Sequence, residues 1–247
     1  MNVIVRADDL GYSEAVNYGI AKAVKQGIVN NVGLMVNMPY AKHGYDLIAN
    51  DNICLGLHAN ISAGEPISSI EEVPALIEEK QFKKSAVYRS SVKDFVNIDE
   101  AVLEVQNQVN RFKEITGFAP HYIDIHAVLN PNFLSAAKAV AEQNEILFVD
   151  VNVKSGTILL NNQGIKMQVE NGKDEEVLYD SFFSTVLDNK EAEIPMIVYH
   201  PGFIDAPLIK SSSVVTERAF QVSFLTSEEV KSTAVKYEID FLRIDEV

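Results

Sequence analysis

The sequence predicts an α/β fold, an irregular (β/α) barrel in which helices surround parallel strands. Short apolar runs alternate along the chain with segments whose apolar residues have helical spacing. The connections between many of these segments are short, which favours a parallel sheet. We also find no repeat and no linker, so we expect a single domain over residues 1–247. A doubly wound open sheet is the alternative, but no Gly-x-Gly-x-x-Gly follows the first predicted strand.

The predicted elements follow from local pattern and from the residues that start and stop helices. Ser13 is a good N-cap, Gly27 and Gly117 are good helix stops, and Asn130-Pro131 is a good helix start. We therefore predict helices at 13–26, 40–49, 98–116, 130–143 and 227–237, with a short one near 71–79. Apolar runs predict strands at 3–7, 31–36, 53–58, 122–125, 146–149, 194–199 and 241–244.

Two stretches fit neither pattern. Residues 61–95 carry glycine, proline and many charges, and we read them as a solvated insertion in preference to a lid or a dimer contact. Residues 152–178 are polar, and we assign no element there.

The composition excludes several classes of partner. The net charge is −14, from 35 acidic and 21 basic residues, and no Lys/Arg cluster stands out. Nucleic acids and anionic membranes both bind best to a basic patch, so neither is expected as a partner.

The single Cys54 cannot form an internal disulfide. We see neither a signal peptide nor an apolar run long enough for a membrane span, which predicts a cytoplasmic protein.

Carboxylates and imidazoles stand at the ends of several predicted strands. Asp8 and Asp9 follow the first strand, and His58, His126 and His200 close three others. In a barrel, catalytic groups come from several strand ends on one face. A role as a helix cap or turn residue would explain one of the two adjacent aspartates, Asp8 or Asp9. The other would then have no structural explanation.

One Asp and two His can hold a divalent metal and leave positions open for water and substrate. Such a metal lowers the pKa of its bound water and polarises a carbonyl. A nearby second Asp could take the proton of the water, and a further His could protonate a leaving amine. These groups together predict metal-assisted hydrolysis of an amide or ester.

Several motifs, in their order and spacing, resemble the YdjC-like carbohydrate deacetylases, relatives of chitooligosaccharide deacetylase. The resemblance covers nearly the whole chain. The motifs that carry it are Ala7-Asp8-Asp9-Leu10-Gly11-Tyr12-Ser13, Asn17-Tyr18-Gly19-Ile20, Gly27-Ile28-Val29, Met35-Val36-Asn37-Met38-Pro39, Leu55-Gly56-Leu57-His58, Gly64-Glu65-Pro66, Pro120-His121-Tyr122-Ile123-Asp124-Ile125-His126 and His200-Pro201-Gly202-Phe203-Ile204-Asp205.

The resemblance implies an irregular (β/α) barrel that removes acetyl groups from acetylated sugars or short oligosaccharides. By position, Asp9, His58 and His126 match the metal ligands, Asp8 the base and His200 the general acid. The resemblance implies Mg²⁺ as the metal, although two imidazole ligands also suit Zn²⁺, Co²⁺ or Mn²⁺. Relatives are often homodimers.

The chain departs from the family pattern at two places. In the family, the stretch that contains the His at this position often reads Ser-His-His-His-Val-His. This chain reads Ile125-His126-Ala127-Val128-Leu129-Asn130 there. The first His is kept, and the lost ones would shape the substrate pocket or tune the metal. Arg6 replaces the Asn that commonly precedes Ala-Asp-Asp.

Three further polar residues have two readings each. Asp124 either orients a metal-bound His or is an ordinary strand-end hydrogen-bonding group. Asn37 and Asn60 either bind sugar hydroxyls or satisfy loop backbone. For the whole protein, the rival functions are another metal-dependent amide or phosphoester hydrolase and a sugar-binding relative without catalysis.

Overall fold

The computed structural model describes residues 1–150, 157–187 and 193–247. Its strands are β1 (Asn2–Leu10), β2 (Asn31–Leu34), β3 (Cys54–Ala59), β4 (Ile77–Glu78), β5 (Gln81–Phe82), β6 (Tyr122–Ile125), β7 (Leu147–Phe148), β8 (Thr157–Leu160), β9 (Gln163–Val169), β10 (Ile194–Tyr199) and β11 (Asp240–Phe241). Its α-helices are α1 (Glu14–Gln26), α2 (Ala41–Ile48), α3 (Ser85–Ser90), α4 (Ile98–Thr116), α5 (Pro131–Gln143), α6 (Glu175–Leu187), α7 (Ala206–Ser211), α8 (Thr216–Leu225) and α9 (Glu228–Lys236). Two 3₁₀ turns are η1 (Pro74–Leu76) and η2 (Ile244–Glu246).

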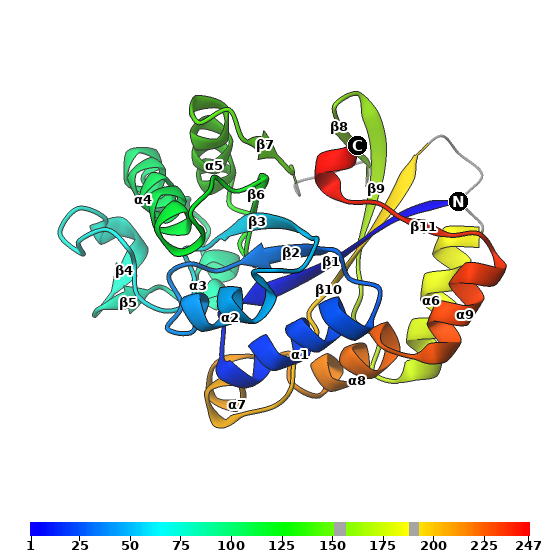
Figure 1. The fold of residues 1–247 in the computed structure, drawn as a ribbon. Coiled ribbons are helices and arrows are strands. Elements are labelled where there is room, and N and C mark those ends of the chain that lie inside the picture. Colours follow the sequence, from blue (N-terminus) through cyan, green and yellow to red (C-terminus); the bar gives the residue numbers. More distant parts are fainter. Residues whose placement is uncertain (151–156, 188–192) are drawn as a thin grey trace.

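The strands form an irregular, nearly closed barrel with helices outside it (Figure 1). Neighbouring strands follow the order β7-β6-β3-β2-β1-β10-β9-β8, and β11 pairs with the start of β1. These pairs are parallel, except for the antiparallel hairpin of β8 and β9. The predicted α/β barrel is therefore confirmed, and the open doubly wound sheet is not found.

Two apolar cores lie on the two faces of the sheet. Alternation along β1 sends Val3 and Val5 to the core between sheet and helices, and Ile4 to the core inside the barrel. Both faces are covered, which is why the strands read as continuous Val/Ile/Leu runs in the sequence. Among the described helices, none is long and apolar enough to cross a membrane.

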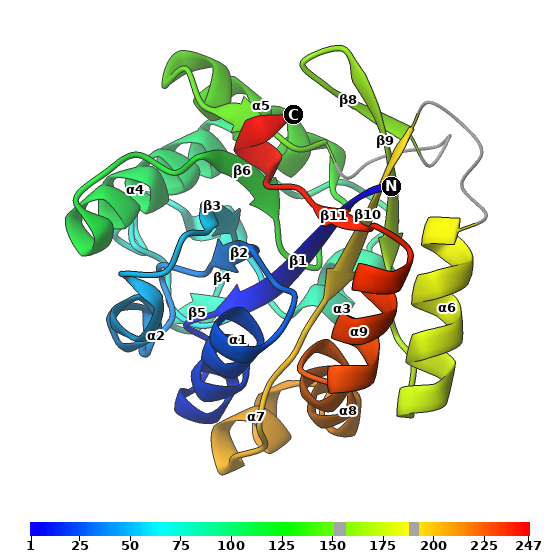
Figure 2. The same ribbon diagram turned by 45° about the vertical axis from the view of Figure 1, so that its right-hand side comes forward.

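The two ends of the barrel differ. At one end, the C-terminal turn η2 lies near the N-terminus of the chain (Figure 2). At the other end, where β1 finishes, the chain passes into α1, and α7 lies nearby (Figure 2). The site residues lie at this second end, beside the carboxyl ends of the parallel strands.

The structure corrects some local predictions. The short helix expected near 71–79 is wrong: only η1 forms there, and the chain then enters the β4–β5 hairpin, whose turn contains Glu79 at φ 59°. The final strand predicted at 241–244 is the shorter β11, followed by η2. Within the unassigned stretch, 157–178 hold β8, β9 and the start of α6, whereas 152–156 lie outside the described residues.

Candidate metal and catalytic site

A bulge at the end of β1 brings the two adjacent carboxylates to one site. The register of β1 against β2 shifts between Ala7 and Leu10, and Asp9 has a left-handed backbone with φ 74°. Adjacent side chains of a regular strand would point to opposite faces, and the bulge removes that separation. Asp tolerates the left-handed region better than most residues do. Both carboxylates are almost fully buried.

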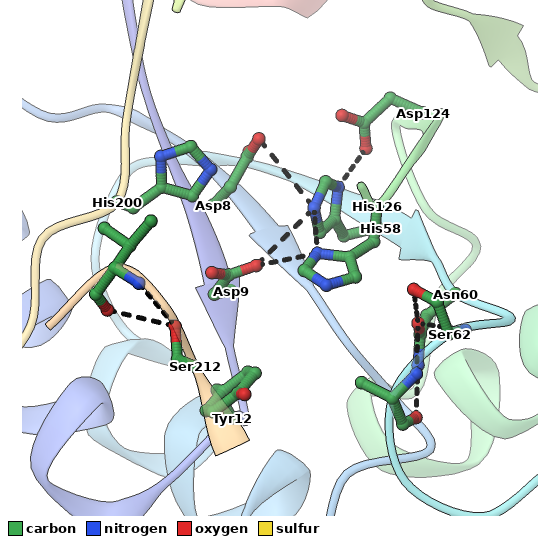
Figure 3. Close-up of polar contacts among 12 residues, drawn as sticks. Asp8, Asp9, Tyr12, His58, Asn60, Ser62, Asp124, His126, His200 and Ser212 are labelled. Atoms are coloured by element: carbon green, nitrogen blue, oxygen red, sulfur yellow. Dashed lines mark hydrogen bonds and ion pairs between the residues drawn. The ribbon is translucent and has the colours of Figure 1, made fainter. Parts of the chain in front are cut away.

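His58 and His126 turn their ring nitrogens toward Asp9 (Figure 3). Nδ1 of His126 lies 3.0 Å from Asp9 Oδ1, and Nε2 of His58 lies 3.6 Å from the same oxygen. The two ring nitrogens are 3.2 Å apart. His58 belongs to β3, and His126 directly follows the neighbouring strand β6, where its backbone N–H bonds to Ala59 O. Three potential ligand atoms therefore meet within 4.8 Å of one another.

Asp124 holds His58 from the next strand. The two residues are register partners across β3 and β6, and Asp124 Oδ1 lies 2.9 Å from His58 Nδ1. This contact fixes Nδ1 as the protonated nitrogen and leaves Nε2 facing Asp9. Of the two readings of Asp124, the structure supports orientation of a site His, and that His is the cross-strand partner His58.

Arg6 links Asp124, the partner of His58, to the carboxylate of Asp8. Its Nη2 lies 2.8 Å from Asp8 Oδ2 and 2.7 Å from Asp124 Oδ2. Arg6 is buried, and its guanidinium lies 5.9 Å from the centroid of the Tyr122 ring. The residue that departs from the family pattern is therefore a structural partner of two site carboxylates.

Helix α8 supports the opposite side of the site. Arg218 Nη2 donates to Asp9 Oδ2 at 2.5 Å, which leaves Asp9 Oδ1 for the histidines. Gln221, one turn further along, accepts the backbone N–H of His200 at 2.6 Å. His200 follows β10, and its ring lies beside Asp8, on the side away from His126 (Figure 3).

Burial and the surrounding charges shift the pKa values of Asp9, His58 and His200. Burial alone would raise the pKa of Asp9, but Arg218 and His126 hold it well below its usual value. Burial opposes a charged imidazole at His58, yet the Asp124 and Asp8 carboxylates raise the pKa of His58 to about 9. At His200, burial lowers the pKa and outweighs the opposite effect of the aspartates.

The residues present fit a divalent metal. Among the described residues, three buried carboxylates (Asp8, Asp9 and Asp124) face two buried guanidiniums (Arg6 and Arg218). With His58 neutral, the form that binds a metal, one negative charge remains, and it favours a further cation at this point. His58 Nε2 and His126 Nδ1 also face each other, which is favourable when a proton or a metal lies between the nitrogens. A carboxylate with two imidazoles, one of them held by a second carboxylate, suits first-row divalent metals.

Another grouping of possible ligands lies elsewhere and fits a metal poorly. Cys54, His121 and Asp245 bring ligand atoms within 4.8 Å of one another. However, His121 Nδ1 accepts the Leu55 N–H, so its other nitrogen carries the proton and has no lone pair for a metal. Arg243 already pairs with Asp245.

Asn37 and Asn60 bond to loop backbone. Asn60 Oδ1 accepts from Ser62 N and Ala63 N, and its Nδ2 donates to Ala63 O. Asn37 Nδ2 donates to Ala63 O and Glu65 O. The structure therefore supports the loop-backbone reading of both residues.

Two adjoining cavities open beside the site. The first has a volume of about 320 Å³ and is lined by Arg6, Asp8, His58, Ile125, His126, Ala127, Leu129, Met167, Val169, Val198 and His200. The second has a volume of about 340 Å³ and is lined by Tyr88, Arg89, Ser91, Lys93, Asp94, Phe95, Ala127, Val128, Leu129, Asn130 and Pro131. Ala127 and Leu129 line both cavities. The second is built partly from the irregular excursion at 61–95, so this stretch borders the site.

A model of the YdjC-like protein family matches residues 2–235. The chain belongs to the YdjC-like family. It is 28% identical to a carbohydrate deacetylase from Clostridium beijerinckii, over all of both chains. It is 29% identical to a chitooligosaccharide deacetylase from Proteus mirabilis, over 93% of this chain and 92% of the relative.

A crystal structure from Enterococcus faecalis has the same fold. That protein bears the provisional name cellobiose-phosphate cleavage protein. It is 23% identical, has a TM-score of 0.83 and aligns over 99% of this chain and 98% of its own.

Two contributors to the YdjC-like site, Arg218 and Gln221, were not predicted from the sequence. Arg218 and Gln221 lie about 200 residues from Asp8 and Asp9, on a helix that we did not predict. They are ordinary Arg and Gln residues in the sequence, without a motif. Among the partners of the predicted site residues, Arg6 alone carried a signal in the sequence, its departure from the family pattern, and that departure did not indicate its contacts with Asp8 and Asp124.

Proposed function

We propose that this protein is a metal-dependent hydrolase that removes acetyl groups from N-acetylated sugars or short oligosaccharides. The observation that carries the proposal is the meeting of Asp9, His58 and His126 around one point, beside a second carboxylate and a third imidazole. The names of the relatives support the substrate class.

Asp9 Oδ1, His58 Nε2 and His126 Nδ1 would hold the metal. A divalent metal bound there would lower the pKa of a water molecule and polarise the acetyl carbonyl. Arg218 keeps the other oxygen of Asp9 occupied, and Asp124 keeps His58 in the required tautomer. We retain Mg²⁺ from the family resemblance, with Zn²⁺, Co²⁺ and Mn²⁺ as the alternatives that imidazole ligands favour.

Asp8 would take the proton of the attacking water. Its Oδ2 is held by Arg6, while Oδ1 is buried without a hydrogen-bond partner among the described residues. His200 would give a proton to the amine nitrogen as the C–N bond breaks. Among the described residues, its ring has no hydrogen-bond or ion-pair partner, and it lies across Asp8 from His126 (Figure 3).

The variants Asp8→Asn and His200→Ala test these two roles. Each should reduce kcat for acetate release from N-acetylglucosamine oligomers by roughly 10²–10⁴-fold, the usual range for general acid–base catalysis. Asp46→Asn is the matched control for Asp8→Asn, since Asp46 is exposed on α2, far from the site in sequence, and forms an ion pair with Lys42 one turn away. Full activity in folded Asp8→Asn and His200→Ala proteins would contradict both roles.

Two rival functions remain distinguishable from this one. Turnover of phosphoesters in place of acetylated sugars would identify a different metal hydrolase on the same scaffold. Binding of sugars without turnover, with each metal tested, would identify a non-catalytic relative. We also retain the cytoplasmic location and the homodimer as proposals, and gel filtration with light scattering tests the second.

A further inference from the structure

We infer that Gln221 is a positioning residue for His200, and that its side-chain amide holds the ends of β9 and β10 apart so that the imidazole faces the cavity. The inference rests on the proposed function, in which His200 protonates the leaving amine. It comes from the backbone hydrogen bonds at the point where the two strands separate.

The regular pairing of β9 with β10 ends just before His200. The two parallel strands are in register up to Val169 and Val198, and the N–H of Glu170 then donates to Val198 O at 2.8 Å. Hydrogen bonds in a parallel ladder are evenly spaced. The next one would therefore run from the N–H of His200 to Glu170 O.

The side-chain amide of Gln221 takes the place of this ladder bond. Its Oε1 accepts the N–H of His200 at 2.6 Å, and its Nε2 donates to Glu170 O at 3.1 Å. Gln221 is fully buried on α8, so water does not compete for these groups. A buried polar side chain needs such partners, and here they are backbone groups of two different strand ends. The amide therefore bridges the ends of β9 and β10 and keeps them apart.

The position of the His200 ring depends on this backbone. Among the described residues, the ring has no hydrogen-bond or ion-pair partner that would hold it directly. The carbonyl oxygen of His200 accepts from Arg218 Nη1 at 3.4 Å, and the N–H of Gly202 donates to Arg218 O at 3.3 Å. The segment that begins with His200 is thus attached to α8 at three backbone groups. It presents the ring to the cavity beside Asp8 (Figure 3).

Loss of the Gln221 amide should move His200 away from the reacting groups. Without it, the N–H of His200 and Glu170 O can pair directly, which draws the end of β10 toward β9. Because β10 lies between β1 and β9, this movement takes His200 away from Asp8 on β1. A displacement of about 1 Å at a catalytic group can lower the rate about 100-fold.

A double-mutant cycle with His200→Ala tests the inference. Gln221→Met, His200→Ala and the double variant of the full chain would be assayed for amine release from N-acetylglucosamine oligomers, with one divalent metal at a time. In the wild-type background, Gln221→Met should lower kcat roughly 10–100-fold and leave KM unchanged. In the His200→Ala background, it should change kcat by no more than about twofold, because the group that it positions is gone.

Metal affinity provides a second readout that does not depend on activity. The Gln221 amide bonds to backbone groups of His200 and Glu170 and to none of the proposed metal ligands. Gln221→Met should therefore bind the metal as tightly as the wild type does, as measured by titration calorimetry.

Gln108→Met is the matched control. Gln108 is also fully buried, and its amide bonds to the N–H and the carbonyl oxygen of Asn60, at the end of β3. Asn60 lies across the site from His200 (Figure 3). Any effect of Gln108→Met on kcat should therefore be equal in the wild-type and His200→Ala backgrounds.

The cycle separates a positioning role from a purely structural one. If Gln221→Met does not fold, Gln221→Asn, which shortens the side chain by one methylene, takes its place with the same expected coupling. An equal loss of kcat in both backgrounds, a loss of metal affinity, or wild-type kcat in a folded Gln221 variant would overturn the inference and leave the proposed deacetylase standing. Amine release from none of the oligomers by the wild type would contradict the proposed function itself.

Discussion

Asp9 owes its position to its backbone. With φ at 74°, it directs its carboxylate to the same site as its neighbour Asp8. Such a backbone is uncommon for a residue other than glycine, and strained positions of this kind cluster at functional sites. Contacts from opposite sides then hold the carboxylate, with Arg218 on Oδ2 and His126 on Oδ1.

Asp124 should control metal affinity without contacting the metal. Asp124→Ala removes the partner of His58 Nδ1, so the imidazole loses its fixed tautomer. We expect metal affinity, measured by titration calorimetry, to fall roughly 10–100-fold. Asp99→Ala, at the start of α4 and outside the site, is the control. Equal metal affinities in the wild type and folded Asp124→Ala would show that Asp124 has no orienting role.

The thiol of Cys54 should be unreactive in the folded protein. It is fully buried, and this burial is the main cause that raises its pKa to about 12. Because the thiolate is the reactive form, a thiol reagent at pH 8 should modify no cysteine in the native protein and one per chain after denaturation. Rapid modification of the native protein would contradict the placement of Cys54.

The residues of the site were predictable to different degrees. Asp8, Asp9, His58, His126 and His200 could be chosen because each follows an apolar strand in the sequence. Their roles remain predictions. Arg218 could not be found, because its contact with Asp9 joins residues 209 positions apart and depends on how α8 packs.

At the scale of elements, most of the parallel strands and the long amphipathic helix α4 were predicted, whereas both antiparallel hairpins and the helices α3, α6, α7 and α8 were not. Buried strands such as β10 are continuous apolar runs, and long amphipathic helices such as α4 have clear caps at Asn97 and Gly117. The six-residue helices α3 and α7 span less than two turns, so no apolar period identifies them. Helix α7 has Pro207 in its first turn, where proline is well tolerated.

Asp205 should stabilise α7 in a pH-dependent way. Its two oxygens accept the N–H groups of Leu208 and Ala15. Burial raises the pKa of Asp205, but these hydrogen bonds outweigh burial and hold it below its usual value. A carboxyl group with a lowered pKa in the folded state stabilises the protein above its unfolded pKa, and this contribution is lost as the pH falls through the folded value.

Asp205→Ala should therefore lower the free energy of unfolding by about 1 kcal/mol near pH 7. Urea unfolding of both proteins at several pH values measures this difference. It should shrink as the pH falls from about 4, where the carboxyl group of the unfolded chain becomes protonated, through the lower pKa of the folded protein. A difference that stays constant down to pH 2, or grows, would contradict a role for the ionised carboxylate.

At the scale of the whole molecule, the barrel brings together side chains from distant parts of the chain. Four parallel strands, β1, β3, β6 and β10, end beside the same site, and α8 closes it from outside. The alternation of strands and helices made this architecture predictable. The antiparallel β8–β9 hairpin was not predicted, although Ile158-Leu159-Leu160 is a short apolar run and the two asparagines that follow it, Asn161 and Asn162, form the turn with left-handed backbones. The single-domain organisation stays a prediction.

The measurement that tests the central claim most directly combines metal content with activity. The protein would be stripped with a chelator and assayed for amine release from N-acetylglucosamine oligomers after addition of Mg²⁺, Mn²⁺, Co²⁺ or Zn²⁺ singly. We predict one bound metal per chain and activity that requires it. Folded His58→Ala should lose both, whereas His43→Ala, whose ring contacts Asn17 away from the site, should keep them. Full activity after chelation, or unchanged metal binding in His58→Ala, would contradict a metal site formed by Asp9, His58 and His126.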